Sequence, residues 1–268
     1  MKKDDCPVVV ICGASAGVGR ATAHAFAAAG YAVGLLARSD EGLAAATSEL
    51  EAYATPTLAI SADVADANAL ALAAQRFEAE LGPIDVWVNS AMVTVFAAIE
   101  QLTPEEIRRV TEVTYLGAVH GTLAALDLMR ARDRGVIIQV GSALAYRAIP
   151  LQSAYCGAKF ALRGFSEALR RELADTNVRV LYFAPRATRT AMNAPSVVAM
   201  NDELGVAMDD PEKVAAELLQ AIRHEQEERY LGWPERLFVR LNGLLPRVVD
   251  QALRKQLPII QRFARHKH

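Results

Sequence analysis

Two side chains that exchange protons stand four residues apart in a helical stretch. Tyr155 and Lys159 therefore lie on one face of the helix expected over residues 153–175. A phenol is a proton donor at neutral pH, and a neighbouring ammonium favours the phenolate and lowers its pKa. Ser142 stands thirteen residues before Tyr155, where its hydroxyl could share the same substrate oxygen. The three residues predict acid–base chemistry on that oxygen.

A glycine-rich turn near the start of the chain could hold a phosphate. An uninterrupted apolar strand over Val8–Cys12 is followed by glycines at positions 13, 17 and 19 and by an alanine-rich helical segment to residue 29. Backbone N–H groups and the helix dipole favour a negative charge there, and glycine lets a pyrophosphate approach. The spacing is GxxxGxG rather than the standard GxGxxG. A turn that only joins strand to helix is the alternative.

The rest of the chain alternates between short apolar strands and longer helical stretches. We expect further strands at residues 31–37, 57–61, 84–89, 135–140 and 178–183, and helices at 39–53, 66–81, 103–132 and 153–175. This order predicts an α/β fold, a doubly wound parallel sheet with helices on both faces. Ligands bind such sheets at the carboxyl ends of the strands. One site should therefore gather residues 13–19, Arg38, Asp63, Asn89, Ser142 and 185–190.

Composition limits the function classes. The 268 residues are 52% hydrophobic and 22% charged, enough for a sizeable core, and the net charge of −2 gives no argument for a nucleic-acid partner. Cys6, Cys12 and Cys156 are scattered, which favours a reducing, cytoplasmic setting without disulfides. No signal-peptide pattern and no membrane-length apolar run is seen. The five histidines show no metal spacing, so no metal is expected.

Taken together, these motifs resemble the classical short-chain dehydrogenases/reductases over roughly residues 7–232. The turn at 13–19 is similar to that family's cofactor turn, Asp63-Val64 to its adenine contact, residues 89–91 to its Asn-Asn-Ala-Gly segment, and Gly141-Ser142 with residues 155–159 to its Ser, Tyr and Lys catalytic set. The resemblance implies a Rossmann-like catalytic domain over residues 1–232. It also implies hydride transfer between a nicotinamide and an alcohol or carbonyl carbon.

The resemblance also assigns roles to individual residues. Tyr155 would be the acid/base, Ser142 would orient the substrate oxygen, and Lys159 would hold the nicotinamide ribose and lower the pKa of Tyr155. Thr114 stands where the family has an asparagine that supports a proton-relay water. The residues implied at the cofactor are Gly13, Ser15, Ala16, Val18, Gly19, Arg38, Asp63, Val64, Asn89, Ala91, Tyr155, Lys159, Pro185, Thr188 and Thr190. Family members assemble through their long helices, which implies a homodimer or homotetramer.

The choice of nicotinamide rests on the end of the second strand. That strand ends Leu36-Ala37-Arg38 without an acid to bind a ribose 2′-hydroxyl, whereas the planar fork of Arg38 suits a 2′-phosphate. NADP is therefore favoured over NAD. Asp40 is close enough in sequence to compete for Arg38.

Three departures from the family pattern support an alternative function. Thr114, Met92 and Arg186 replace an asparagine and two glycines that are usual in the family. Arg186 could reach the pyrophosphate or an acidic substrate, or it could be a solvated loop residue. The alternative is an NADP(H)-binding regulator or scaffold with impaired catalysis.

The last part of the chain predicts the substrate class and a possible membrane partner. Residues 191–208, rich in Met, Val and Ala, stand where the family has a substrate lid and suit a hydrophobic substrate. Nine Lys/Arg against two acids fall in residues 229–268. We expect residues 233–268 to form three short amphipathic helices, preceded or broken by proline. They could bind a membrane surface, or fold over the chain's own pocket or a partner subunit.

Overall fold

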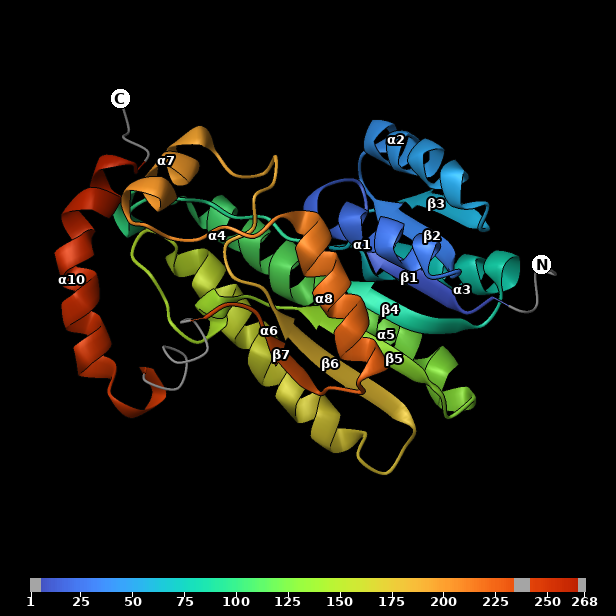
Figure 1. Cartoon of the computed structure of the whole chain (residues 1–268). Coiled ribbons are helices and arrows are strands. Elements are labelled where there is room, and N and C mark those ends of the chain that lie inside the picture. Colours follow the sequence, from blue (N-terminus) through green and yellow to red (C-terminus); the bar gives the residue numbers. More distant parts are fainter. Residues whose placement is uncertain (1–5, 234–241, 265–268) are drawn as a thin grey trace.

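The computed structural model describes residues 6–233 and 242–264 (Figure 1). Its centre is one sheet of parallel strands in the order β3-β2-β1-β4-β5-β6-β7. The strands are β1 Val8–Cys12, β2 Ala32–Ala37, β3 Thr57–Ser61, β4 Ile84–Asn89, β5 Gly135–Val140, β6 Val178–Ala184 and β7 Glu228–Tyr230. The helices are α1 Gly17–Ala28, α2 Asp40–Leu50, α3 Ala67–Leu81, α4 Pro104–Thr111, α5 Gly117–Ala131, α6 Ser153–Glu172, α7 Pro195–Glu203, α8 Pro211–Arg223 and α10 Pro246–Arg262. The predicted doubly wound sheet is confirmed.

Alternate residues of the buried central strand divide the core between the two faces of the sheet. Val9 and Ile11 pack with Phe26 of α1 and Leu218 of α8, and these two helices lie side by side on one face (Figure 1). Val8 and Val10 join a second core with residues of α3 and α5 on the other face. Because helices cover both faces of the sheet, β1 is apolar at every position.

Side chains at the helix starts satisfy backbone N–H groups. Ser39 accepts a hydrogen bond from the Gly42 N–H (3.0 Å). Thr103 and Glu106 form a reciprocal capping box in front of α4. Such caps define where each helix begins and so where the loops at the carboxyl edge end.

The helix expected over residues 103–132 is interrupted. A π-helical turn, Glu112–Leu116, separates α4 from α5. At its centre the Thr114 hydroxyl accepts a hydrogen bond from Val93 N (3.1 Å) and donates one to Val93 O (3.0 Å), so the wider turn is tied to the loop after β4. The edge strand β7 was not expected, because its sequence Glu-Arg-Tyr lacks an apolar pattern.

The C-terminal extension differs from the three short helices expected. Pro258 lies inside α10, which continues across it as one helix, although a proline ring removes one backbone donor and crowds the carbonyl four residues earlier. Helix α10 lies beside α7 at one end of the molecule (Figure 1), and Arg262 pairs with Glu203 of α7. The part of the expectation that concerned residues 234–241 and 265–268 lies outside the described residues. No helix within residues 6–233 and 242–264 combines the length and apolar character needed to cross a bilayer.

Candidate active site

A cleft of about 590 Å³ runs along the carboxyl ends of the strands. It joins the turn after β1 to the loops after β4, β5 and β6, to the segment around α7, and to α10. Its lining includes most of the predicted site, namely Gly13, Ser15, Ala16, Val18, Gly19, Arg38, Val64, Ala91, Ser142, Tyr155, Lys159, Pro185, Thr188 and Thr190. Segments far apart in the sequence therefore form one continuous site.

The glycine turn has the geometry of a phosphate cradle. Gly13 has φ +86°, and a Cβ there would lie 2.7 Å from the Ala91 Cα, so only glycine fits where the two loops meet. A Cβ at Gly19 would lie 2.1 Å from the Gly13 carbonyl oxygen. Ala16 is the N-cap of α1, and no side chain of the described residues caps the backbone N–H groups of the first turn. That turn also carries no acidic residue. These backbone N–H groups therefore fit the pyrophosphate of a dinucleotide.

Ser142, Tyr155 and Lys159 meet beside the cradle. The Ser142 hydroxyl accepts a hydrogen bond from Leu144 N (3.1 Å), and the Tyr155 hydroxyl lies 3.6 Å from the Met92 sulfur. Lys159 Nζ lies 5.8 Å from the centre of the Tyr155 ring and donates a hydrogen bond to the Val140 carbonyl (2.6 Å). All three residues are buried at the cleft wall.

The expected lowering of the Tyr155 pKa by Lys159 is not what this environment produces. Burial raises the pKa of Tyr155 to about 12, with a hydrogen bond from Ser142 lowering it in part and Cys156 raising it. Burial also lowers the pKa of Lys159 to about 7. Removal from water favours the neutral form of each group, and Lys159 Nζ is directed at Val140 rather than at the phenol. Tyr155 is therefore protonated at neutral pH.

Arg38 is near a carboxylate other than the expected Asp40. Its guanidinium lies 3.8 Å from Asp63, and its side chain is 56% exposed. Asp63 is held more tightly by Arg109 (2.8 Å) and accepts a hydrogen bond from Ala65 N (3.0 Å). Although burial acts in the opposite direction, these bonds lower the pKa of Asp63. Because Arg109 carries most of the interaction with Asp63, Arg38 is available to an anion in the cleft.

Three predicted residues do not line the cleft within the part of the chain that the structure describes: Asp63, Asn89 and Thr114. The buried Asn89 amide instead accepts from Trp87 Nε1 (2.9 Å) and donates to Thr122 and Gln139. Thr114 is fully buried and bonded to Val93, as described above. Asn89 therefore joins the end of β4 to β5 and α5, and Thr114 supports the loop after β4. A direct contact with a substrate or cofactor stays a prediction for both.

Arg186 is not a solvated loop residue. It lines the cleft and forms a bidentate ion pair with Asp209 (2.7 and 2.9 Å), whose other neighbour is Lys213 (2.9 Å). The hydrogen bond from Arg186 lowers the pKa of Asp209, although burial opposes it. Thr188 pairs with Asp209 as a β-bridge, so both ends of the segment that contains α7 are joined. Sequence reasoning missed Asp209, because nothing local connects it to Arg186.

Helix α10 supplies part of the cleft wall. Gln256 and Ile260 line it, and Ile260 is 2% exposed. The amphipathic pattern of the extension was the only sequence signal for this contact, and it was equally compatible with a membrane or a partner.

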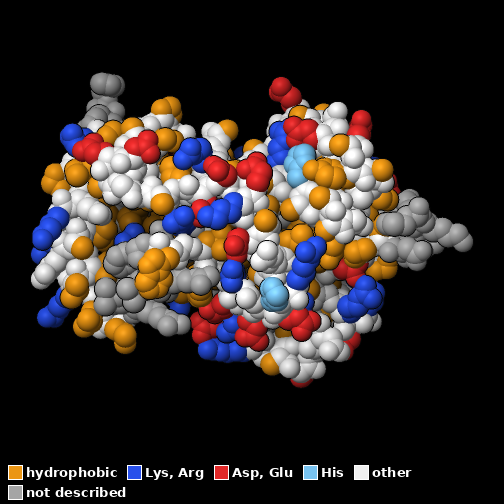
Figure 2. Space-filling view, in the orientation of Figure 1, with side chains coloured by type: hydrophobic (Ala, Val, Ile, Leu, Met, Phe, Trp, Pro, Cys, Tyr) orange, Lys and Arg blue, Asp and Glu red, His pale blue; other side chains and the backbone are white. Residues whose placement is uncertain are grey.

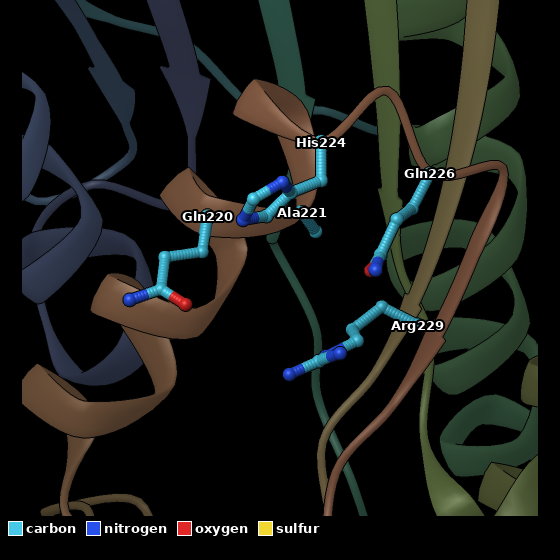
Figure 3. Close-up of a pocket in the computed structure, with 5 residues that line it drawn as sticks. All are labelled: Gln220, Ala221, His224, Gln226 and Arg229. Carbon is cyan, nitrogen blue, oxygen red and sulfur yellow. The ribbon is translucent and has the colours of Figure 1, made fainter.

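A second hollow, of about 410 Å³, lies between α8 and β7 (Figure 3). Gln220, Ala221 and His224 from α8 line it together with Gln226 and Arg229, whose side chains approach each other. The Arg229 guanidinium is paired with Glu217. None of these residues belongs to the described lining of the cleft. No grouping of three or more metal-ligating side chains occurs in residues 6–233 and 242–264.

Comparison with known proteins identifies the family. A sequence model described as short chain dehydrogenase matches residues 7–201, and the chain belongs to this family. The uncharacterized oxidoreductase YxnA of Bacillus subtilis is 32% identical over 261 residues, which cover 95% of this chain and 73% of that protein. We therefore describe the chain as an oxidoreductase of the short-chain dehydrogenase/reductase class.

Solved structures support the same assignment. An alcohol dehydrogenase from the archaeon Thermococcus sibiricus, complexed with 5-hydroxy-NADP, is similar with a TM-score of 0.75 and 27% identity over 85% of this chain and 96% of that one. A short chain dehydrogenase/reductase from Burkholderia phymatum in complex with NAD has a TM-score of 0.83 at 21% identity, over 92% of this chain and 96% of that one, which shows the common fold. The neighbours thus hold both kinds of nicotinamide nucleotide.

Proposed function

We propose that this protein transfers a hydride between NADP(H) and a hydrophobic carbonyl or alcohol. The observation that carries the proposal is a single cleft in which a phosphate cradle, the Ser142–Tyr155–Lys159 group and an apolar end are continuous. None of these parts would need to adjoin the others in a chain that only binds a nucleotide.

Tyr155, Ser142 and Lys159 have separate roles in the proposed reaction. A bound nicotinamide supplies the hydride chemistry. Tyr155, which has a pKa of about 12, donates a proton to the carbonyl oxygen during reduction. During alcohol oxidation it accepts the proton of the alcohol. Ser142 hydrogen-bonds that oxygen and orients it. Lys159 would bind the ribose hydroxyls of the cofactor, and the negative charge of the cofactor would favour the protonated form of this buried amine.

The proposed preference for NADP rests on Arg38 and Arg109. Arg109 neutralises Asp63 at 2.8 Å, whereas Arg38 remains 3.8 Å from it and 56% exposed at the cleft. A 2′-phosphate at this place would meet an arginine fork, and Asp63 would repel it less because Arg109 is paired with it. Arg109 thereby extends the sequence-based argument, which considered Arg38 alone.

The proposed substrate is apolar because most of the side chains that the segment around α7 and helix α10 contribute to the cleft are apolar, with Asn193, Asn201 and Gln256 as polar exceptions. Met192, Val197, Met200 and Leu204 from the segment around α7 line the cleft, and Ile260 of α10 completes the wall. Apolar lining with few polar groups binds apolar ligands. Small, charged carbonyls should therefore be poorer substrates than hydrophobic ketones.

The decisive experiment follows NADPH oxidation with a panel of ketones of increasing hydrophobicity. We expect turnover of the apolar members, and loss of turnover without loss of NADPH binding in Tyr155→Phe. The alternative, a regulator or scaffold with impaired catalysis, is motivated by Thr114, whose hydroxyl donates its hydrogen to the Val93 carbonyl and accepts from the Val93 N–H. Tight NADPH binding without oxidation by any ketone, and no effect of Tyr155→Phe, would establish that alternative.

Two further proposals concern partners. The family resemblance supports a homodimer or homotetramer, which sedimentation would test.

A peripheral membrane contact is supported by Leu244, Leu245 and Val248, which are 80%, 53% and 51% exposed at the start of α10. Lys and Arg side chains lie along the outer edge of the same helix (Figure 2). Failure of the intact protein to sediment with anionic vesicles would refute the membrane contact.

A further inference from the structure

Tyr182, on β6, lies directly behind the loop that carries Ser142. Its side chain is 3% exposed, and its hydroxyl accepts a hydrogen bond from the Ser142 backbone N–H (3.4 Å). The neighbouring residue is glycine: a Cβ at Gly141 would lie 2.1 Å from the Tyr182 Cζ. The tyrosine ring therefore occupies the space that a side chain at position 141 would need.

A group of other side chains holds the Tyr182 ring. The Tyr146 ring meets it edge-on, with 6.1 Å between the ring centres. Tyr146 is in turn covered by the Arg163 guanidinium at 3.6 Å and contacts Tyr230. The contacts lead away from the cleft, since Tyr230 bonds Glu228 on the edge strand β7. The mechanism proposed above uses none of these residues.

We propose that Tyr182 is a positioning residue for Ser142. Its hydroxyl and its packing against Gly141 fix the backbone from which the serine hydroxyl reaches the substrate oxygen. Tyr182 does not belong to the described lining of the cleft, so it acts through Ser142 and not by contact with the substrate. This inference rests on the proposed function, because it assigns Ser142 a role in turnover.

The physical reason is that a serine hydroxyl is directed by its own backbone. Ser142 has φ −163° and ψ 152°, an extended conformation, immediately before a short 3₁₀ turn at Ala143–Ala145. The Ser142 amide N–H has no acceptor within that turn, because Ser142 precedes the turn. Without Tyr182 Oη, this buried donor loses its partner, and the loop relaxes to satisfy it elsewhere.

The test compares Tyr182→Phe with Tyr230→Phe, a matched loss of one phenol hydroxyl in the same aromatic group but away from Ser142. Amide hydrogen exchange at residues 141–145 is measured first, because it needs no turnover. We expect exchange at Ser142 to be roughly fivefold faster in Tyr182→Phe and unchanged in Tyr230→Phe. We also expect kcat to fall by about fivefold with the KM for NADPH unchanged.

A pH profile separates positioning from a general loss of structure. Alcohol oxidation requires deprotonated Tyr155, and the hydrogen bond from Ser142 lowers the pKa of that phenol. A displaced Ser142 should move the oxidation profile to higher pH, by about half a unit, in Tyr182→Phe. Ser142→Ala should produce a similar shift, and the double variant should add nothing to it.

The outcomes distinguish this inference from the proposed function. Unchanged Ser142 exchange in Tyr182→Phe, or an unchanged pH profile, overturns the role of Tyr182 even in an active enzyme. A wild-type protein that reduces no ketone overturns the proposed function, and the positioning role falls with it. Faster exchange with a shifted profile supports both.

Discussion

The buried amine of Lys159 should make the protein less stable at neutral pH than a variant without it. Lys159 is 2% exposed, and burial lowers its pKa from 10.5 to about 7. The unfolded chain therefore binds one more proton than the folded chain between these two values. Stability contributed by this group is lowest below pH 7 and rises as the pH increases towards 10.5.

The size of the effect can be worked from the pKa difference. One pKa unit corresponds to about 1.4 kcal/mol, so burial of the charged amine costs on the order of 4 kcal/mol at neutral pH. Replacing the amine by the Met side chain removes this cost but also loses the hydrogen bond to Val140, worth ~1 kcal/mol. The net gain of Lys159→Met is roughly 3 kcal/mol. For 268 residues, an unfolding entropy of ~2.1 cal/mol/K per residue converts this to about 5 °C in Tm.

The assay is thermal unfolding of wild type and Lys159→Met between pH 6 and pH 10. We expect Lys159→Met to melt higher at pH 6–7, and the difference to shrink steadily as the pH rises. Lys255→Met, at an exposed position on α10, is the matched control and should show no such pH dependence. A difference in Tm that is the same at every pH, or a variant less stable than wild type at pH 7, refutes the reasoning.

Three more predictions follow from other contacts. Arg186→Leu removes the bidentate partner of buried Asp209 and leaves the exposed Lys213 beside it, and it should cost about 2–4 kcal/mol in urea unfolding at pH 7. Because the folded-state pKa of Asp209 is lowered, this cost should vanish as the pH falls through that pKa; equal stability of the two proteins at pH 7 would contradict the ion pair. Arg38→Leu should raise the Kd of NADPH by roughly tenfold or more and leave that of NADH nearly unchanged, by fluorescence titration; equal losses for both would exclude a 2′-phosphate contact. Ile260→Trp, which narrows the cleft beside α10, should raise the KM of bulky ketones while NADPH binding is kept. An unchanged KM would place the substrate elsewhere.

Local sequence patterns determined the order of elements and the chemistry of the site. The apolar strand followed by glycines predicts a strand, a tight turn and a helix start, because each depends on residues a few positions apart. Tyr155 and Lys159 could be placed on one helix face for the same reason. The carboxyl-edge rule for parallel sheets then brought Ser142 to them, and the structure places all three at one cleft.

Only the tertiary structure decided what surrounds those groups. The pairing of Arg186 with Asp209, the contact of Tyr182 with Ser142 and the seating of α10 against the cleft join residues distant in sequence. The predicted lowering of the Tyr155 pKa was wrong for a related reason. The sequence shows a nearby amine, but it does not show how far both groups are removed from water. Spacing along a helix is a local property, whereas burial and long-range partners depend on how the whole chain packs.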